Sequence, residues 1–230
     1  DAPRHRQFST FIVELPNPGY RIVRDIGTMA AEGPLSHVLG GGHSEVEIKD
    51  LVVPAENLLG GEGNGFAMGQ HRLAYGRLRH GMHNVAMAQR ALDLATAHVT
   101  SRSTFGKPLD ERQGVQWMLA DCASELYMAR LMLMHIAYKA ERGMDLRQEN
   151  SIAKVFLAHM VHKVVDTAIQ LHGALGYSTD TPLARWYTHI RSQRLVDGPD
   201  EVHRWTVGRN VIKAFKEHGT TASAAGGDLL

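Results

Sequence analysis

The periodicity of the apolar residues changes near Gly65, and this change limits the folds open to the chain. Before Gly65, apolar and polar residues alternate in short runs, as where Val46 and Ile48 follow Glu45 and Glu47. After Gly65, apolar residues recur every three or four positions over long stretches. A period of two is typical of β-strands, and a period near 3.6 is typical of α-helices. The sequence therefore predicts an α+β fold, in which a β region precedes a helical region.

The β region covers residues 1–60. The runs expected as strands are 8–13, 20–23, 45–48 and 51–53. The sequence PNPG at 16–19 predicts a turn, and the three glycines at 40–42 predict a loop or hairpin turn. The first run begins almost at the first residue, with almost nothing ahead of it to pair with. We therefore expect the chain to start inside a domain, with only part of an antiparallel β domain present.

The helical region covers residues 61–218, and its long helices with short connections predict a four-helix bundle. Five helices are expected. The first runs from shortly after Gly65 to about residue 101, the second covers about 111–142, and the third covers about 150–173. A short fourth begins at Pro182, and the fifth runs from Pro199, as first helical residue, to about Lys216. The inward face expected for the first is Leu78, Met82, Val85, Gln89, Leu92, Ala95 or Thr96, and Val99. The face expected for the second is Val115, Leu119, Cys122, Leu126, Leu133 and Ile136. The third is apolar on most sides, which predicts a central position. Residues 219–230 are small and polar, which predicts a disordered tail.

Composition excludes several classes of protein. The formal charge of +1 gives no strong attraction to nucleic acid or anionic membranes, and 43% hydrophobic residues are enough for a core. The apolar runs are too short for a membrane-spanning helix, and the N-terminal residues lack the apolar core of a signal peptide. Cys122 is the only cysteine, in an apolar periodic stretch, which predicts a buried thiol and a reducing compartment.

Two patterns that can indicate ligand binding are better explained by local structure. GGEGNGF at 60–66 lacks the lysine of a phosphate-binding P-loop and is expected to be a flexible entry to a helix. The pairs His80 and His83, and His159 and His162, have a spacing that can ligate a metal, but neither pair has an evident third ligand. We expect no metal site.

The sequence SRSTFGKPL, at 101–109, has two interpretations. Arg102 and Lys107 are cations near a helix C-terminus, which the helix dipole favours. The same cations around Phe105 can instead bind a phosphate group while the aromatic ring packs on a flat ligand.

Two other short segments are also open to a structural and a functional interpretation. Gly173 and Gly176, in QLHGALGY, are either helix-capping glycines or positions where the backbone approaches a ligand. Asp197, in DGPDE, is either a cap for the helix that follows or a catalytic base.

The order of these segments resembles the C-terminal half of the acyl-CoA dehydrogenases, from about residue 8 to 216. The segments that carry the resemblance are VVPAENLLGGEGNGF, AQRALDLA, SRSTFGKPLDERQ, QLHGALGY and DGPDEVHR. DGPDEVH looks like the branch of the family that carries a kinase-like domain ahead of the dehydrogenase in animals.

The resemblance implies a flavoenzyme. Members hold FAD between an N-terminal helical domain, a middle β domain and a C-terminal four-helix bundle. They remove a proton α to a thioester carbonyl and pass a hydride from the β carbon to the flavin. The resemblance also implies a role in fatty acid metabolism, a homodimer or homotetramer, and an electron-transfer flavoprotein as acceptor.

The resemblance assigns site residues position by position. Those matched to FAD are Arg102, Phe105, Gln113, Gln170, Leu171, His172, Gly173, Ala174, Pro199, Asp200 and Glu201, and those matched to the substrate are Arg77 and Gly198. Arg102 resembles an arginine that meets the FAD pyrophosphate, usually of a neighbouring subunit. Arg77 resembles an arginine that contacts the CoA portion, and Gly198 lies by the thioester.

Asp197 occupies the position of the family's catalytic glutamate. The usual Tyr-Glu-Gly-Thr sequence is here Val196-Asp197-Gly198-Pro199, so the acid is one methylene shorter. Some members carry the base on the first bundle helix instead, at the position of Gly76, which has no side chain to serve.

Three functions are compatible with these residues. The first is FAD-dependent dehydrogenation of an acyl-CoA. The second is that of another flavoenzyme of the same fold, such as a nitroalkane oxidase, which also uses an aspartate. The third is an oligomerisation module without catalysis. Because the N-terminal helical domain and the first part of the β domain are expected to lie outside these 230 residues, we expect the fragment alone to be inactive. The expected location is the cytoplasm if bacterial, and the mitochondrial matrix or peroxisome if eukaryotic.

Overall fold

The structure is a computed structural model that describes residues 2–30 and 43–226. The chain divides into two compact units, Asp1–Leu73 and Ala74–Leu230. The division falls inside the first long helix, α1 (Gly65–Ser101), whereas the sequence pattern places the start of the helical region at residue 61.

The first unit consists of short antiparallel strand pairs. β2 (Tyr20–Ile26) pairs with β3 (His43–Ile48), and β1 (Thr10–Phe11) pairs with β4 (Leu58–Leu59). The single-turn 3-10 helices η1 (Arg4–Arg6) and η2 (Ala55–Asn57) complete the unit's elements before α1. Every residue of β3 is exposed, so the β2–β3 ladder is held by backbone hydrogen bonds and by the cross-strand pairs Arg21–Glu47 and Arg24–Glu45. These strands confirm the antiparallel β part of the predicted α+β fold.

Some β predictions differ from the structure. The run at 51–53 forms no strand, and the run at 8–13 pairs only at Thr10 and Phe11. The turn at 16–19 is present: Tyr20 N–H donates to Asn17 O at 3.0 Å, and Gly19 N–H donates to Asn17 Oδ1 at 2.9 Å. The turn expected at 40–42 lies outside the described residues.

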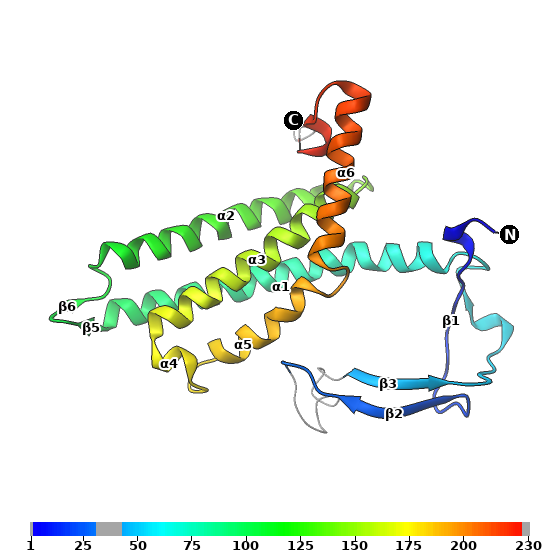
Figure 1. Ribbon diagram of the computed structural model, residues 1–230, viewed down its shortest axis with the longest axis horizontal. Helices are drawn as coiled ribbons and strands as arrows, with labels where there is room; N and C mark the ends of the chain where they lie inside the picture. The colour runs from blue at the N-terminus through cyan, green and yellow to red at the C-terminus, as the bar shows by residue number, and fades with distance from the viewer. Residues whose placement is uncertain (1, 31–42, 227–230) are drawn as a thin grey trace. The chain divides into compact units, whose positions relative to one another are not determined.

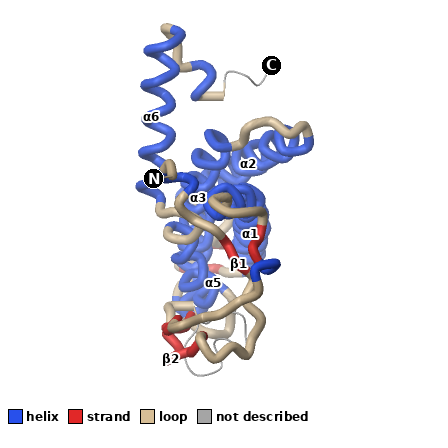
Figure 2. Tube along the Cα trace, turned by 90° about the vertical axis from the view of Figure 1, so that its right-hand side faces the viewer, coloured by secondary structure: helices blue, strands red, loops and turns tan. Residues whose placement is uncertain are grey.

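The second unit is a helical bundle (Figure 1). Its elements after α1 are the hairpin of β5 (Ser103–Thr104) and β6 (Lys107–Pro108), α2 (Gln113–Glu141), α3 (Arg147–His172), α4 (Ala174–Tyr177), α5 (Leu183–Ile190), the 3-10 helix η3 (Arg191–Arg194), α6 (Asp200–His218) and the 3-10 helix η4 (Ala222–Ala224). α6 runs steeply across the direction of α3 in two perpendicular views (Figures 1 and 2). The bundle confirms the predicted helical part of the fold.

The central position predicted for α3 is correct. It contacts α2, α4, α5, η3 and α6, and its buried residues include Leu157, Met160, Val161 and Val164. Within the described part of the chain, no helix is both long and apolar enough to cross a membrane.

The inward face of α2 is predicted well, and that of α1 only in part. Cys122, Leu126, Leu133 and Ile136 of α2 are buried, and burial raises the pKa of the Cys122 thiol. On α1, Ala95 and Val99 are buried as predicted, and Leu78, Val85 and Leu92 are partly buried against the core. The buried residues of α1 are small ones, Gly81, Asn84, Ala88, Ala91, Ala95 and Val99, whereas Met82 is 52% exposed. A Cβ added at Gly81 would lie 2.7 Å from Leu133 Cδ2, so α1 approaches its neighbours too closely for large side chains at this face.

The C-terminal region differs from its prediction in two places. Pro199 precedes α6 with an extended backbone and is not its first helical residue. Residues 222–224, expected in a disordered tail, form η4, where Ala224 is 6% exposed and its carbonyl accepts a hydrogen bond from Gln148 Nε2 at 2.7 Å. Small residues do not prevent order here because α3 and α6 supply a surface for them.

Candidate functional site

A sharp loop between η3 and α6 carries Asp197 and Gly198. Both have left-handed backbone conformations, with φ of 54° and 103°. Asp tolerates this region better than most residues, and Gly adopts it without a steric penalty. A Cβ added at Gly198 would lie 2.9 Å from His203 Nε2, so no larger residue fits there unless His203 moves.

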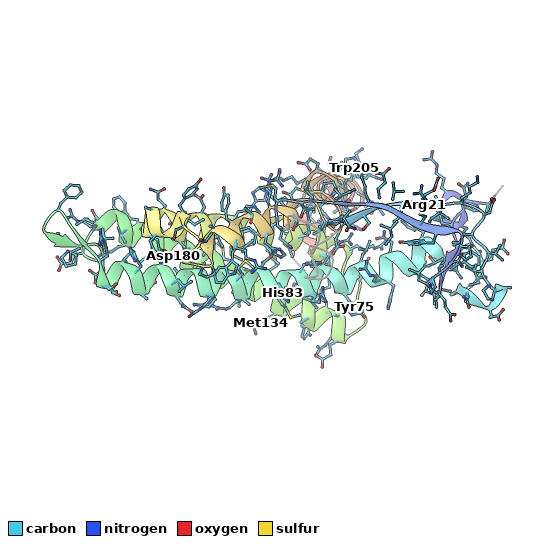
Figure 3. The ribbon with its side chains drawn as sticks, turned by 90° about the horizontal axis from the view of Figure 1, so that it is seen from below. Arg21, Tyr75, His83, Met134, Asp180 and Trp205 are labelled. Carbon is cyan, nitrogen blue, oxygen red and sulfur yellow. The ribbon has the colours of Figure 1, made fainter. Side chains whose placement is uncertain are left out.

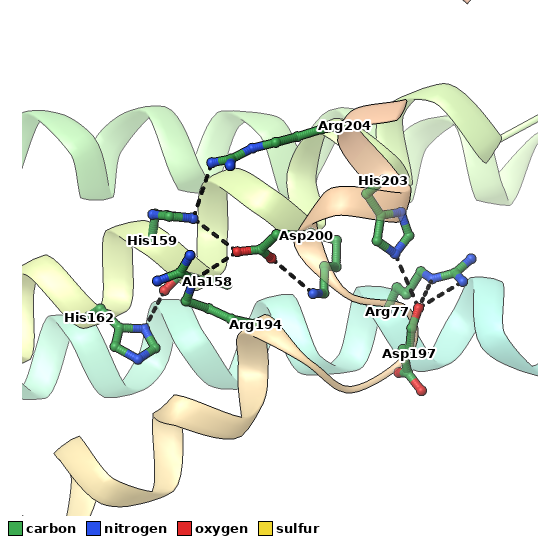
Figure 4. Close-up of polar contacts among 10 residues, drawn as sticks. Arg77, Ala158, His159, His162, Arg194, Asp197, Asp200, His203 and Arg204 are labelled. Carbon is green, nitrogen blue, oxygen red and sulfur yellow. Dashed lines mark hydrogen bonds and ion pairs between the residues drawn. The ribbon is translucent and has the colours of Figure 1, made fainter. Parts of the chain in front are cut away.

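The carbonyl oxygen of Asp197 is held by two side chains from different helices (Figure 4). Arg77 of α1 donates to it from Nε at 3.1 Å and from Nη2 at 2.9 Å. Buried His203 of α6 lies with Nε2 at 3.1 Å, and since a carbonyl only accepts, Nε2 is the protonated nitrogen. These contacts offset the strain of a non-glycine residue in the left-handed region.

Burial lowers the pKa of both groups that hold the carbonyl. It lowers the pKa of His203, against the opposing effect of the hydrogen bond to Asp197, and therefore favours the neutral ring. Burial also lowers the pKa of Arg77, against the opposing charge of Asp197, but arginine remains charged in proteins.

The carboxylate of Asp197 lies beside α1. Its Oδ2 is 3.4 Å from His80 Nε2, and a Cβ added at Gly76 would lie 3.5 Å from the same oxygen. The adjoining cavity, of about 20 Å³, is lined by Arg77, His80, Gly81, Asn84, Lys154, Leu157, Gln193, Val196 and Asp197. That volume is enough for roughly one water molecule, so the cavity is not by itself a pocket for an organic ligand.

Asp200 occupies a different environment, although only two residues separate it from Asp197. Its side chain is 1% exposed, and Lys154 Nζ donates to Oδ1 at 3.0 Å. Arg194 Nε and His159 Nε2 bind Oδ2 at 2.8 and 3.0 Å (Figure 4). Burial by itself would raise the pKa of Asp200, but the hydrogen bonds from Arg194 and Lys154 outweigh it and lower the pKa. The carboxylate therefore joins α3, η3 and α6 as an anion.

Sequence reasoning missed several residues of this region. Lys154, Arg194 and His203 were not singled out, and His159 was considered only in a metal pair. One signal was available for Lys154, because a lysine on the nearly all-apolar stretch of α3 requires a buried partner. The identity of that partner depends on tertiary structure. Among the described residues, no three His, Cys, Asp or Glu side chains gather as metal ligands.

The other site residues lie at the ends of α1 and α3. The rings of His98 and His172 stack with centroids 4.4 Å apart, which brings these two helix ends together. Burial lowers the pKa of His98, and the nearby His172 and Arg102 lower it further. Arg102 and Gln113 are exposed, at the end of α1 and the start of α2.

Most of the residues that the resemblance matches to FAD at the ends of α1 and α3 are exposed. Phe105, at the hairpin tip, is 99% exposed and has a φ of 52°. Gln170, Gly173 and Ala174 are exposed where α3 ends and α4 begins, whereas Leu171 is buried. Two glycines flank this segment in different roles: Gly173 has a φ of 62°, and Gly176 is buried where an added Cβ would lie 2.7 Å from Ile169 O.

The two groups of residues are far apart within one chain. Arg77 lies on α1 and Arg102 directly follows it, about 25 residues further on, which is roughly 37 Å at 1.5 Å per residue. Pro199, Asp200 and Glu201 lie with the Asp197 group, at the start of α6. The structure therefore separates the predicted site residues into a base group around Asp197 and a cofactor group around Arg102.

Comparisons with known proteins identify the family of the chain. The family model for the C-terminal domain of acyl-CoA dehydrogenases matches residues 63–212. Acyl-CoA dehydrogenase family member 10 of Mus musculus is 39% identical over 92% of this chain, and acryloyl-CoA reductase (NADH) of Anaerotignum propionicum is 33% identical over 89%. The structure of butyryl-CoA dehydrogenase from Megasphaera elsdenii is 28% identical, with a TM-score of 0.82 over 90% of this chain.

The chain belongs to the acyl-CoA dehydrogenase family. It spans 20% of the mouse relative, 50% of the reductase and 52% of the butyryl-CoA dehydrogenase chain. The matched region is thus the C-terminal part of longer proteins.

Asp200→Asn is expected to destabilise the protein by about 3–5 kcal/mol, because it leaves the buried Lys154 ammonium and Arg194 without their counter-charge. Denaturant unfolding measures this loss. Glu201→Gln, at the exposed next position, is the control and should change the free energy of unfolding by less than about 0.5 kcal/mol.

The loss should also depend on pH. The pKa of Asp200 is lowered in the folded state, so its contribution is present above the unfolded value of about 3.9 and disappears as the pH falls through the folded value. The difference between wild type and Asp200→Asn should therefore be full at pH 7 and shrink in acid. A difference that stays constant down to pH 3 would show that the carboxylate charge is not the source.

Proposed function

We propose that this chain supplies the catalytic base and part of the FAD site of an acyl-CoA dehydrogenase, with Asp197 removing the proton α to the thioester carbonyl. The observation that carries this proposal is the contrast between the two aspartates of DGPDE. Both oxygens of Asp200 are bound by cations, which leaves it unsuited to accept a proton. Asp197 has its carbonyl, not its carboxylate, held by Arg77.

The local geometry also supports Asp197 as the base. Gly76, the position where the family resemblance places the alternative base, lies directly beside the Asp197 carboxylate. The two possible base positions of the family therefore meet at one place in this fold. Gly198 adds no side chain on the other side, which leaves room for a thioester to approach.

The base position requires a rigid loop, because a base must come within about 2.6–3.2 Å of the proton it removes. Arg77 and His203 hold the Asp197 carbonyl from two helices, and Asp200 fastens the start of α6. We assign Arg77 to this role in addition to any contact with the CoA portion. Proton removal by Asp197 generates electron density at the α carbon, and the hydride leaves from the β carbon.

The residues around Arg102 fit FAD. Arg102 is an exposed cation at a helix end, where it can donate charge-assisted hydrogen bonds to a pyrophosphate. Phe105 is 99% exposed in a strained backbone conformation, and contact with a flat ligand would offset that exposure. We propose that the cofactor group around Arg102 is completed by Gln113, Gln170, His172, Gly173 and Ala174, with Leu171 as its buried support. In the base group around Asp197, we propose that Pro199 and Glu201 contact FAD. Bound FAD supplies the hydride acceptor.

The separation of the two groups supports a homo-oligomer. A span of roughly 37 Å along α1 places Arg102 too far from Asp197 for both to lie beside one reacting centre, so we propose that the Arg102 group serves the FAD of a second copy. An apolar groove between α3 and α6, formed by Ile152, Val155, Phe156, Val207 and Gly208, supplies a surface for contact. Trp205 on α6 and Met134 on α2 are 62% and 67% exposed (Figure 3).

The substrate and the electron acceptor follow from the family resemblance. By the family resemblance, an acyl-CoA is the substrate and an electron-transfer flavoprotein is the acceptor of the electrons. Because the relatives are longer, we propose that residues beyond these 230 complete the flavin site, and the experiments below use the full-length FAD-loaded protein.

Asp197→Asn is expected to slow flavin reduction by acyl-CoA at least about 10²–10⁴-fold, because it removes the proton acceptor. Asn tolerates the left-handed backbone as Asp does, so the fold and FAD content should not change. Anaerobic stopped-flow bleaching of the flavin measures the rate, and Asp121→Asn, which makes the same change at an exposed position of α2, serves as the control. Normal bleaching by Asp197→Asn would contradict the proposal, as would wild-type flavin that responds to a nitroalkane and not to acyl-CoA.

Arg102→Ala is expected to weaken FAD affinity about ten- to a hundredfold, through loss of charge-assisted hydrogen bonds to the pyrophosphate. Equilibrium dialysis of FAD against the apoprotein measures this change. Arg90→Ala removes an exposed arginine from the same helix, at the middle of α1, and should leave the affinity within about twofold. Equal affinity of Arg102→Ala and wild type would assign Arg102 to helix capping alone.

The full-length protein is expected to sediment as a dimer or tetramer. Val207→Glu places a charge in the α3–α6 groove and should shift the protein to smaller species, because an unpaired charge is costly to bury. Lys216→Glu, at an exposed position of the same helix, should leave the sedimentation coefficient unchanged. A wild-type monomer at micromolar concentration would overturn the oligomer proposal.

A further inference from the structure

One side chain of α1 faces the carboxylate of Asp197. His80 Nε2 lies 3.4 Å from Asp197 Oδ2, and the His80 side chain is 35% exposed. His80 lies one helical turn after Gly76 and Arg77, the other α1 positions that meet this loop. The helix thus presents one residue to the backbone of Asp197 and another to its carboxylate.

The contacts with the Asp197 carbonyl do not determine where its carboxylate points. Arg77 and His203 hold the backbone, but the terminal torsion of an aspartate is broad and permits many orientations. An aspartate side chain is also one methylene shorter than the glutamate usual in the family. A wrongly oriented Asp197 carboxylate would therefore fall short of the substrate proton more easily than a glutamate would. A second hydrogen bond, made to one carboxylate oxygen, would remove this freedom.

His80 is the residue placed to make that hydrogen bond. Lys154 borders the same cavity, but its ammonium is bound to Asp200 Oδ1 at 3.0 Å. His80 Nε2 lies at 3.4 Å from Asp197 Oδ2, on the side where the cavity meets α1.

We propose that His80 is a positioning residue for the base: its ring N–H donates to Asp197 Oδ2 and leaves the other carboxylate oxygen to accept the substrate proton. This inference rests on the proposed function of Asp197. It predicts that loss of the ring N–H slows the chemical step while substrate binding is retained.

The test compares two substitutions at His80 in the full-length FAD-loaded protein. His80→Leu keeps a side chain of moderate size and removes the donor. His80→Gln places an amide N–H close to the position of Nε2. His83→Leu is the matched control, because His83 is an exposed histidine one turn further along α1 (Figure 3).

The rate of flavin bleaching at saturating acyl-CoA is expected to fall about tenfold in His80→Leu, in line with the loss of one hydrogen bond to a charged group. The thioester dissociation constant should stay within about twofold. His80→Gln should recover most of the rate, and His83→Leu should match wild type. A His80→Leu protein with the wild-type limiting rate would overturn the proposal, and so would a folded His80→Gln protein as slow as His80→Leu.

A second measurement separates this inference from the proposed function. In protein with ¹⁵N-labelled histidine, Asp197→Asn should shift the ring resonances of His80 and leave those of His83 unchanged. Unchanged His80 resonances would overturn the contact itself. If the resonances shift but wild-type flavin is not bleached by acyl-CoA, the proposed reaction fails while the His80–Asp197 contact stands.

Discussion

The placement of α6 depends on one buried carboxylate. Asp200 is the first residue of α6, and its partners lie on α3 and η3. The amphipathic contact of α6 with the bundle is modest, since Ala214 is its only buried apolar residue in the described helix. An apolar face of that size does not specify an angle or a register, whereas three directed hydrogen bonds to one carboxylate do. Positions of α6 that separate Asp200 from Lys154 would leave a buried charge unpaired and are therefore disfavoured.

The same anchor determines where Asp197 lies. Only two residues, Gly198 and Pro199, separate the two aspartates, and both have restricted or unusual backbones. Because α6 is fixed on one side of the loop and η3 on the other, so short a loop has few accessible conformations. The left-handed conformation of Asp197 is accepted because Arg77 and His203 bind the carbonyl that this conformation turns toward α1. Positioning of the carboxylate therefore rests on contacts from α1, α3, η3 and α6 together.

The sequence predicted what local periodicity controls and missed what tertiary distance controls. The order of the strands and helices follows from apolar spacing, and the buried face of α2 follows from its large residues. The face of α1 is predicted only in part, because the large side chain of Met82 was expected inward, whereas the small residues Gly81 and Ala91 are buried there. The sequence matched Asp200 only to FAD and did not predict its contact with Lys154, since no local rule pairs residues 46 positions apart. Arg77 and Asp197, separated by 120 positions, meet for the same reason.

The length of α1 connects the two groups of site residues and also keeps them apart. A single helix of 37 residues carries Arg77 in its first half and ends next to Arg102. An α-helix bends only gently, so α1 fixes the distance between the base group and the cofactor group of one chain. One chain cannot close that distance by loop movement, because both groups are attached to the same rigid element. A second copy can, if the Arg102 end of one bundle lies beside the Asp197 loop of the other. The proposed function therefore requires assembly to complete the site, independently of any exposed apolar surface.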